Sequence, residues 1–345
     1  MKSTAEERLS DRLAIGILIW AFPPDRVDGA IRASGRAGIR TRLLPPLITV
    51  YYVLAMCLFP YKPYEELARL LAEGLALSDP TGVLSLSCVP STAAISRARM
   101  RLGIQPLREL FAQTAVRPPV EGAPRFRRSR LWTLTGGTVN LPDHAAQGGA
   151  PGTPRMRIAV VAEHGTGMLI GAQVEPLSGD PSKSADELFR LLGPGDLLVA
   201  QAEFAGPELA GAALATGADL LWSVPQSTGL PVTETLDDGS YLSVPASWPD
   251  DPVRGRPVVR VVTGAKCAER LVTTLLDPAQ ATRAELRGVY EARWRFEEAA
   301  EQLDAFRRTP KKAMRSRSPE MMEQELWGYL LVYCAIRNLA KNRNL

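Results

Sequence analysis

Cysteine and histidine are scarce in this chain of 345 residues, which contains four cysteines and two histidines. The cysteines form no C-x-x-C pair and stand far apart, at Cys57, Cys88, Cys267 and Cys334. Because three of them have apolar surroundings, we expect buried free thiols in a reducing compartment rather than disulfides or a zinc site. His144 and His164 lack the spacing of metal ligands, and we interpret them as loop residues.

Long apolar segments are also missing. The longest, residues 43–60, holds only about 13 apolar residues between its prolines, whereas a membrane span requires roughly 20. We therefore expect a buried helix there. The first ten residues lack the apolar region of a secretory signal, so we expect a cytoplasmic protein. With 46% hydrophobic and 23% charged residues, the composition is that of a folded chain long enough for two domains.

A large excess of charge is missing as well, since the net charge of +4 is too small to indicate a nucleic-acid partner by itself. The arginines and lysines are nevertheless clustered, in segments 32–42, 97–101, 125–130 and 307–317. One such run is usually a solvated loop. Four on one chain favour a phosphate-binding surface, because polyanion binding is driven by counterion release along a basic track.

Helical patterns separated by proline and glycine fill the first third of the chain, to about residue 118. They cover residues 10–20, 24–33, 46–58, 63–75 and 91–115. In the last of these, Ser91 or Thr92 can cap a helix that stops at Gly103. Its later turns carry Arg97, Arg99 and Arg101. The pattern suits a DNA-recognition helix and an amphipathic surface helix equally well.

Strand patterns begin at about residue 130 and follow the order β-β-β-α-β-α-β, which predicts an α/β fold with a mixed sheet. Short strand patterns at about 225–276 predict a β-rich insertion, with a turn at the segment DDGS. Two helices are expected after it, at about 282–306 and 318–342.

The helix pattern VYEARWRFEEAAEQLDAF, residues 289–306, contains a polar stripe with a spacing of three and four residues. The stripe consists of Tyr290, Arg293, Glu297, Glu301 and Asp304. It is either a solvated face with Arg and Glu pairs or a face that directs a carboxylate into a site. The order of residues in this segment alone does not decide between them.

Several segments together resemble the DDE transposases of insertion sequences, specifically the IS-four (IS4) family. They include AFPPDRVDGAIRASG, VPSTAAISRARMRLG, GPGDLLVAQAEFAG, TGADLLWSV and YEARWRFEEA, the last of which fits the family motif Y-x-x-R-W-x-(I/F)-E. The resemblance covers nearly the whole chain. It implies a helical DNA-binding domain over residues 1–118 and an RNase H-like domain over residues 119–345, with the β-rich insertion and the C-terminal helices in the second domain.

The same resemblance implies the residues of the site. Glu297 takes the position of the catalytic glutamate, and Tyr290 and Arg293 take those of side chains that support DNA phosphates. Lys311 and Lys312 belong to a basic segment expected to contact DNA, like the three arginines of residues 97–101. The family's chemistry uses three carboxylates to hold two Mg²⁺ or Mn²⁺ ions about 4 Å apart for phosphoryl displacement.

Two of those three carboxylates are absent from this sequence. Thr135 occupies the position of the first aspartate and Gln201 that of the second. Ala202 and Asp304 replace a cationic arginine and lysine of the family pattern. The neighbouring acids that might substitute as ligands are Glu203, Asp143 and Glu163, and we expect each to be a surface carboxylate or a local hydrogen-bonding partner.

We therefore expect a transposase homologue that recognises double-stranded DNA and does not cut it, with Glu297 alone an insufficient metal ligand. A second copy of the chain on DNA is a further expected partner, and neither a membrane nor a small-molecule substrate is expected. Two alternatives stay open: an active transposase with shifted metal ligands, and a decayed element copy without function.

Overall fold

A computed structural model describes the greater part of the chain. The described residues are 4–37, 44–78, 86, 88–119, 121–140, 155–176, 181–204, 206–250, 255–263, 270–301, 315–316 and 318–343. The side chains of residues 4–8, 138–140, 155, 181–184, 203, 294–301 and 341–343 are not described. Within these ranges, no helix combines the length and the apolar character that crossing a bilayer requires.

Two compact units make up the chain, and each is described by itself. The helical unit comprises Met1–Val116, Val139–Met156 and Glu301–Leu345, and the sheet unit comprises Arg117–Thr138 and Arg157–Ala300. The sequence had placed all of residues 119–345 in one domain. The last helix instead belongs to the helical unit, where its buried apolar side chains pack with the N-terminal helices.

The helical unit contains α1 (Thr4–Ala21), α2 (Pro24–Ala33), α3 (Pro46–Leu58), α4 (Tyr64–Ser78), α5 (Thr92–Leu102), α6 (Gln105–Thr114) and α12 (Pro319–Arg343). Helix α3 confirms the predicted buried helix, since its residues from Ile48 to Cys57 are all buried. Helix α12 packs against α3 and α6. The pattern at residues 91–115 forms two helices, and the first of them, α5, ends at Gly103 as predicted, where this glycine has a φ of 67°.

The sheet unit is built on one mixed sheet, with the strand order β4-β3-β2-β5-β6-β10-β9-β8-β7 in the described part of the chain. The strands are β1 (Arg125–Phe126), β2 (Ser129–Asn140), β3 (Arg155–Glu163), β4 (Leu169–Pro176), β5 (Asp196–Ala200), β6 (Asp219–Val224), β7 (Glu234–Thr235), β8 (Tyr241–Ser243), β9 (Val259–Thr263) and β10 (Arg270–Thr273). β2, β5 and β6 run parallel, and the insertion strands extend the sheet from β6 through antiparallel pairing. The expected RNase H-like mixed α/β fold is thus observed.

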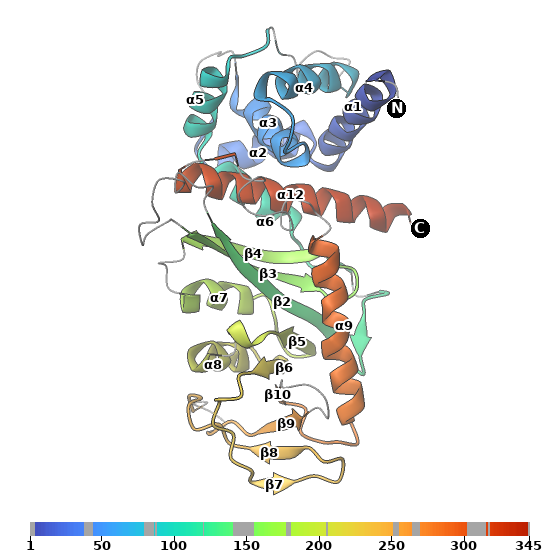
Figure 1. The fold of residues 1–345 in the computed structure, drawn as a ribbon, viewed down its shortest axis with the longest axis vertical. Coiled ribbons are helices and arrows are strands. Elements are labelled where there is room, and N and C mark those ends of the chain that lie inside the picture. The colour runs from blue at the N-terminus through green and yellow to red at the C-terminus, as the bar shows by residue number, and fades with distance from the viewer. Residues whose placement is uncertain are drawn as a thin grey trace. The chain divides into compact units, whose positions relative to one another are not determined.

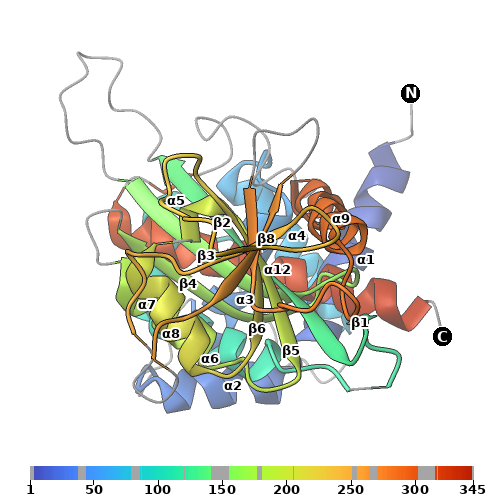
Figure 2. The same cartoon turned by 90° about the horizontal axis from the view of Figure 1, so that it is seen from below.

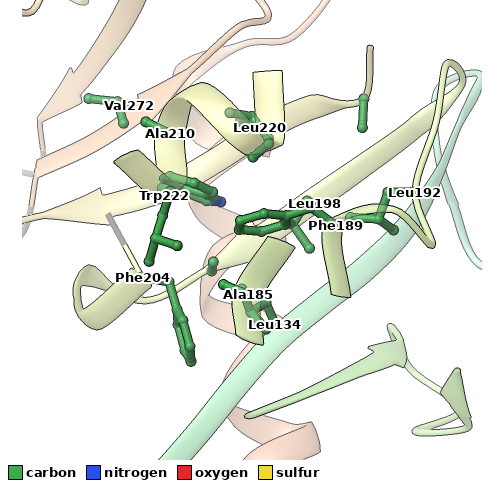
Figure 3. Close-up of a cluster of buried hydrophobic side chains, with 14 of the residues drawn as sticks. Leu134, Ala185, Phe189, Leu192, Leu198, Phe204, Ala210, Leu220, Trp222 and Val272 are labelled. Atoms are coloured by element: carbon green, nitrogen blue, oxygen red, sulfur yellow. The ribbon is translucent and has the colours of Figure 1, made fainter. Parts of the chain in front are cut away.

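Helices cover both faces of this sheet. Helix α7 (Pro181–Phe189) and α8 (Pro207–Ala215) lie on one face, and α9 (Arg283–Glu301) lies on the other (Figures 1 and 2). The α7/α8 face forms a core with Trp132, Leu198 and Trp222, of which Figure 3 shows the part around Leu134, Ala185, Phe189 and Leu198. The α9 face forms a second core, in which Leu286 and Tyr290 pack with Leu131, Leu197, Val199 and Leu221.

The start of α9 is fixed by side chains. Thr282 and Glu285 cap it reciprocally: the Thr282 amide donates to Glu285 Oε2 at 2.9 Å, and the Glu285 amide donates to Thr282 Oγ1 at 3.3 Å. The carboxylate of Asp238 accepts from the Arg283 amide at 3.1 Å and pairs with buried Arg260 on β9. These contacts hold α9 in place on its face of the sheet, which is the face that matters for the candidate site.

Candidate active site

Thr135 and Gln201 occupy neighbouring positions on the two central parallel strands. The register of β2 and β5 ends with Leu134 opposite Ala200, so the next residues of both strands are Thr135 and Gln201. Side chains alternate along a strand, and residues 131 and 197 face α9 whereas 132 and 198 face α7 and α8. Thr135 and Gln201 are therefore on the α9 face, where Thr135 is 9% exposed.

Helix α9 brings the position of the third carboxylate to the same face. Leu286, Tyr290 and Arg293 are spaced by four and three residues, and all three are buried against the sheet. Glu297 follows Arg293 by four residues, so the helical repeat continues this inner stripe to position 297. The side chain of Glu297 lies outside the described residues. The backbone therefore brings positions 135, 201 and 297 to one face of the sheet, and the catalytic assignment of Thr135, Gln201 and Glu297 stays a prediction.

Tyr290 and Arg293 form a stacked pair inside the unit. The guanidinium carbon of Arg293 lies 3.7 Å from the centre of the Tyr290 ring. Arg293 is 0% exposed and Tyr290 is 4% exposed. A cation at this position over an aromatic face is attracted to the ring. In this structure the pair holds α9 against the sheet, and a direct contact with a DNA phosphate requires Arg293 to leave this position.

His164 is buried, although the sequence indicated only a loop residue. It follows β3 in a turn, and its Nδ1 lies 3.0 Å from Oγ1 of Thr133 on β2. Burial and, to a smaller extent, the positive charge of Arg293 lower the pKa of His164 below 6.5. The imidazole is therefore neutral at pH 7 and is part of the packing beside the site. No spacing signal in the sequence could have revealed its bond to Thr133.

Glu163 does not supply a replacement ligand. Its Oε1 pairs with Arg130 at 2.5 Å, and its Oε2 accepts a hydrogen bond from Thr166 Oγ1 at 2.7 Å. The next residue, His164, donates its amide to the carbonyl of Leu131, four residues before Thr135 on β2. At about 3.3 Å per residue, Leu131 and Thr135 are roughly 13 Å apart along β2, so Glu163 lies well below the level of Thr135. Glu163 is a local hydrogen-bonding partner, as the sequence predicted.

Asp196, at the other end of β5, is likewise engaged. Its carboxylate accepts bonds from Arg117 at 2.6 and 2.7 Å, from Trp132 Nε1 at 2.8 Å and from the Gly193 amide at 2.9 Å. The guanidinium groups of Arg117 and Arg130 lie 4.7 and 4.6 Å from the Trp132 ring centre. This network lies at the amino ends of β2 and β5, and both oxygens of the Asp196 carboxylate accept hydrogen bonds within it.

The described residues do not fit a two-metal site. Thr135 offers a hydroxyl and Gln201 an amide, both neutral, where hard divalent cations prefer carboxylate oxygen. No group of three or more His, Cys, Asp or Glu side chains that could hold a metal ion occurs in the described part of the chain. Asp143, His144 and the side chain of Glu203 lie outside that part.

Helix α5 separates its three arginines into two groups. Ser91 caps the helix, as predicted, by accepting from the Ala94 amide at 3.3 Å. Arg97 and Arg101 are exposed. Arg99 is 4% exposed and donates to Gln324 Oε1 and Ser316 Oγ, both at 2.9 Å.

The prediction that all three arginines contact DNA is therefore corrected for Arg99, because its guanidinium is enclosed between α5 and α12. Lys311 and Lys312, the other predicted DNA contacts, lie outside the described residues.

Comparisons with known proteins bear on the family and the fold. Residues 12–112 match the family described as "Insertion element 4 transposase N-terminal". Over 336 residues, 91% of this chain and 74% of the relative, the chain is 23% identical to "Transposase InsG for insertion sequence element IS4" of Escherichia coli (strain K12). The chain is similar in fold to the piggyBac transposase in a synaptic complex with hairpin DNA, with a TM-score of 0.50, 11% identity and coverage of 95% of this chain and 74% of that one. The resemblance to IS4 transposases is thereby confirmed.

Proposed function

We propose that this chain, a homologue of the IS4 transposases, binds transposon-end DNA and does not perform metal-dependent strand cleavage or transfer. The observation that supports the second half is the register of β2 and β5, whose last pair, Leu134 and Ala200, directly precedes the neutral residues Thr135 and Gln201 that we assign to the family's aspartate positions. The proposal implies a protein that works on chromosomal DNA in the cytoplasm and binds neither Mg²⁺ nor Mn²⁺ productively.

The chemical reason is charge. A two-metal mechanism places two divalent cations about 4 Å apart, and anionic ligands must offset their mutual repulsion. The three positions of this site supply one carboxylate, Glu297. The acids Glu163 and Asp196 lie at the other end of the strands and already neutralise arginines, and withdrawing Glu163 from its pair would leave the buried guanidinium of Arg130 unpaired. In this proposal the site therefore does not bind a second divalent cation.

Helix α5 supplies the DNA-binding surface in this proposal. It has no acidic residue, and its exposed side carries Arg97 and Arg101 together with Ser96 and Met100. Phosphate contacts from arginine give affinity through counterion release, and short polar side chains allow a helix to approach the duplex closely. The inward position of Arg99 attaches this helix to α12 and keeps the exposed pair in a fixed orientation.

An active transposase with shifted ligands is the rival function. The engagement of Glu163 removes one of its three candidate ligands, which leaves Glu203 and Asp143. A decayed copy without function is the third alternative. The DNA that flanks the gene bears on these alternatives: intact terminal inverted repeats favour a recent element, and their absence favours a resident or decaying gene.

The test of DNA binding is titration of the full chain with duplex DNA from the flanks of the gene, at several salt concentrations. Binding should weaken steeply with salt, since each phosphate contact contributes about −0.9 to the log–log slope. The double variant Arg97→Ala/Arg101→Ala should make the log–log slope less steep by about 1.8, the contribution of two phosphate contacts.

The matched control removes the same charge elsewhere. Arg190 and Arg256 of the sheet unit have side chains that are 77% and 72% exposed. Arg190→Ala/Arg256→Ala should leave the slope unchanged. Absence of binding at low salt, or equal loss in the two double variants, contradicts the assignment of α5.

A further inference from the structure

Helix α1 exposes an apolar stripe that the described residues of the protein do not cover. Its side chains are Leu9, Leu13, Ile17 and Trp20, which are 55%, 62%, 38% and 57% exposed. The spacing of four, four and three residues puts them on one face of the helix. Single exposed leucines are ordinary, but four large apolar side chains in a row including a tryptophan mark an interaction surface.

The opposite face of α1 is fully used within the helical unit. Ile15, Leu18 and Ile19 are buried, and α1 packs mainly against α4. The two helices approach closely at Gly74, where a Cβ atom would lie 2.5 Å from Cγ2 of Ile15. Because this contact fixes the rotation of α1, the stripe cannot turn inward without loss of the α1–α4 packing.

The charges beside the stripe are neutralised inside the same unit. Asp11 pairs with Lys62 at 2.9 Å, and Arg12 pairs with Glu73 at 2.5 Å. From Leu13 to Trp20 the helix carries no charged residue. A surface without basic excess attracts neither DNA phosphates nor anionic lipid, and two copies of it do not repel each other.

We propose that this stripe is the surface through which two copies of the chain associate, with their α1 helices packed antiparallel around a two-fold axis. In the proposed register, Leu9 of one copy faces Trp20 of the other, and Leu13 faces Gly16. The two-fold axis then passes midway between residues 14 and 15. Gly16 lies on the stripe, three residues after Leu13, and its missing side chain leaves room for the facing leucine. Such an isologous pairing closes at two copies.

The exposed area of the stripe sets the size class of the interface. Each stripe exposes on the order of 400 to 500 Å², so a pair buries roughly 900 Å² from these side chains, which is near the lower limit of specific interfaces. An interface of this size is typical of weak, transient association, so the dimer should form only at raised protein concentration, and its stability should not decrease with added salt. The proposal does not rest on DNA binding, because the arginines concerned are on α5.

Sedimentation equilibrium of the full chain without DNA tests the proposal. The weight-average mass should rise with concentration from 37.5 kDa toward twice that value, and it should do so equally at low and high salt. Leu13→Glu should shift the dissociation constant upward by at least 100-fold. Leu77→Glu is the matched control, since Leu77 on α4 is 65% exposed, and it should leave the association unchanged.

Disulfide formation tests the antiparallel register, in a Cys88→Ser/Cys267→Ser background that removes the exposed thiol and the one outside the described residues. Leu13→Cys lies near the two-fold axis and should give a cross-linked dimer on mild oxidation. Leu9→Cys is about 16 Å from its own copy along the helix axis and should not. A monomer at all concentrations, equal effects of Leu13→Glu and Leu77→Glu, or equal cross-linking at residues 9 and 13 each overturns the proposal.

Discussion

Arg99 on α5 donates a hydrogen bond of 2.9 Å to Oε1 of Gln324 on α12, 225 residues later in the chain. Gln324 returns two bonds, from its Nε2 to the carbonyls of Arg99 and Gly103, at 3.0 and 2.7 Å. The end of α5 and the start of α12 are thus joined by one exchange of polar groups. This contact divides the arginines of α5 into an inner one that holds the helix and an outer pair available to DNA.

Arg99→Ala is expected to destabilise the protein by about 2 to 4 kcal/mol, because it leaves Oε1 of the buried Gln324 without its donor and removes the hydrogen bond to Ser316 Oγ. Arg97→Ala, at an exposed position of the same helix, should change the free energy of unfolding by less than about 0.5 kcal/mol. Urea unfolding of the two variants checks this. Equal stability of the two would show that Arg99 does not serve the packing.

Gly74→Ala is expected to destabilise the helical unit by about 1 to 3 kcal/mol, since the added Cβ would collide with Ile15 where α1 and α4 cross. Ile15 is branched at Cβ and cannot move aside by rotation alone. Gly29→Ala in α2 is the control, because a Cβ there meets nothing within 4 Å. Alanine favours helix over glycine, so Gly29→Ala should stabilise the protein by up to about 1 kcal/mol. Thermal melts should show a lower melting temperature for Gly74→Ala and an equal or higher one for Gly29→Ala.

Glu163→Gln is expected to cost about 3 to 5 kcal/mol of stability, because it leaves the buried guanidinium of Arg130 without its carboxylate. The loss should be the same in EDTA and in Mg²⁺, as measured by chemical unfolding. A metal-dependent difference would instead make Glu163 a ligand and support the rival function with shifted ligands.

Acidification should destabilise the protein through His164. Its pKa in the folded protein is below 6.5, so the unfolded chain binds this proton more readily than the folded one between the two pKa values. The unfolding free energy should therefore fall as the pH drops below about 6.5, by at most about 1.4 kcal/mol per pH unit from this group. In His164→Gln the fall between pH 7 and pH 5 should be smaller. An unchanged pH profile in that variant contradicts this account.

Local signals in the sequence predicted much of the fold. Pro24 and Pro46 each stand at the start of a helix, Ser91 caps α5 and Gly103 ends it, as their residue types require. The assignment of Thr135 and Gln201 to the first and fourth strands came from the family resemblance, and the structure shows that these strands, β2 and β5, are parallel neighbours.

Long-range contacts could not be predicted in the same way. Helix α12 packs with the helical unit because Gly328 allows a close approach to Val53 and Cys57 of α3, a pairing that no local pattern reveals. The burial of Arg99 depends on Gln324, and the engagement of Glu163 depends on Arg130. In both cases a charged residue type indicates a surface position, and only its distant partner shows otherwise.

Restoring the lost charges should restore the chemistry if only the site has changed. Thr135→Asp/Gln201→Asp returns both carboxylates, and Ala202→Arg with Asp304→Lys returns the cationic partners. We expect this quadruple variant to gain a rise in melting temperature with Mg²⁺ or Mn²⁺ that Glu297→Gln abolishes, and to regain some DNA cleavage. Failure on both readouts would place the defect beyond these four positions.

The most direct test of the account is a cleavage assay with the unmodified protein, Mg²⁺ or Mn²⁺, and a supercoiled plasmid that carries the DNA flanking the gene on both sides. The loss of one electrostatic element of such a site typically costs on the order of 10² to 10³ in rate, and here two carboxylates are missing. The account predicts binding of this plasmid with no metal-dependent nicking or strand transfer. Metal-dependent cleavage by the unmodified chain, abolished by Glu297→Gln, would contradict it.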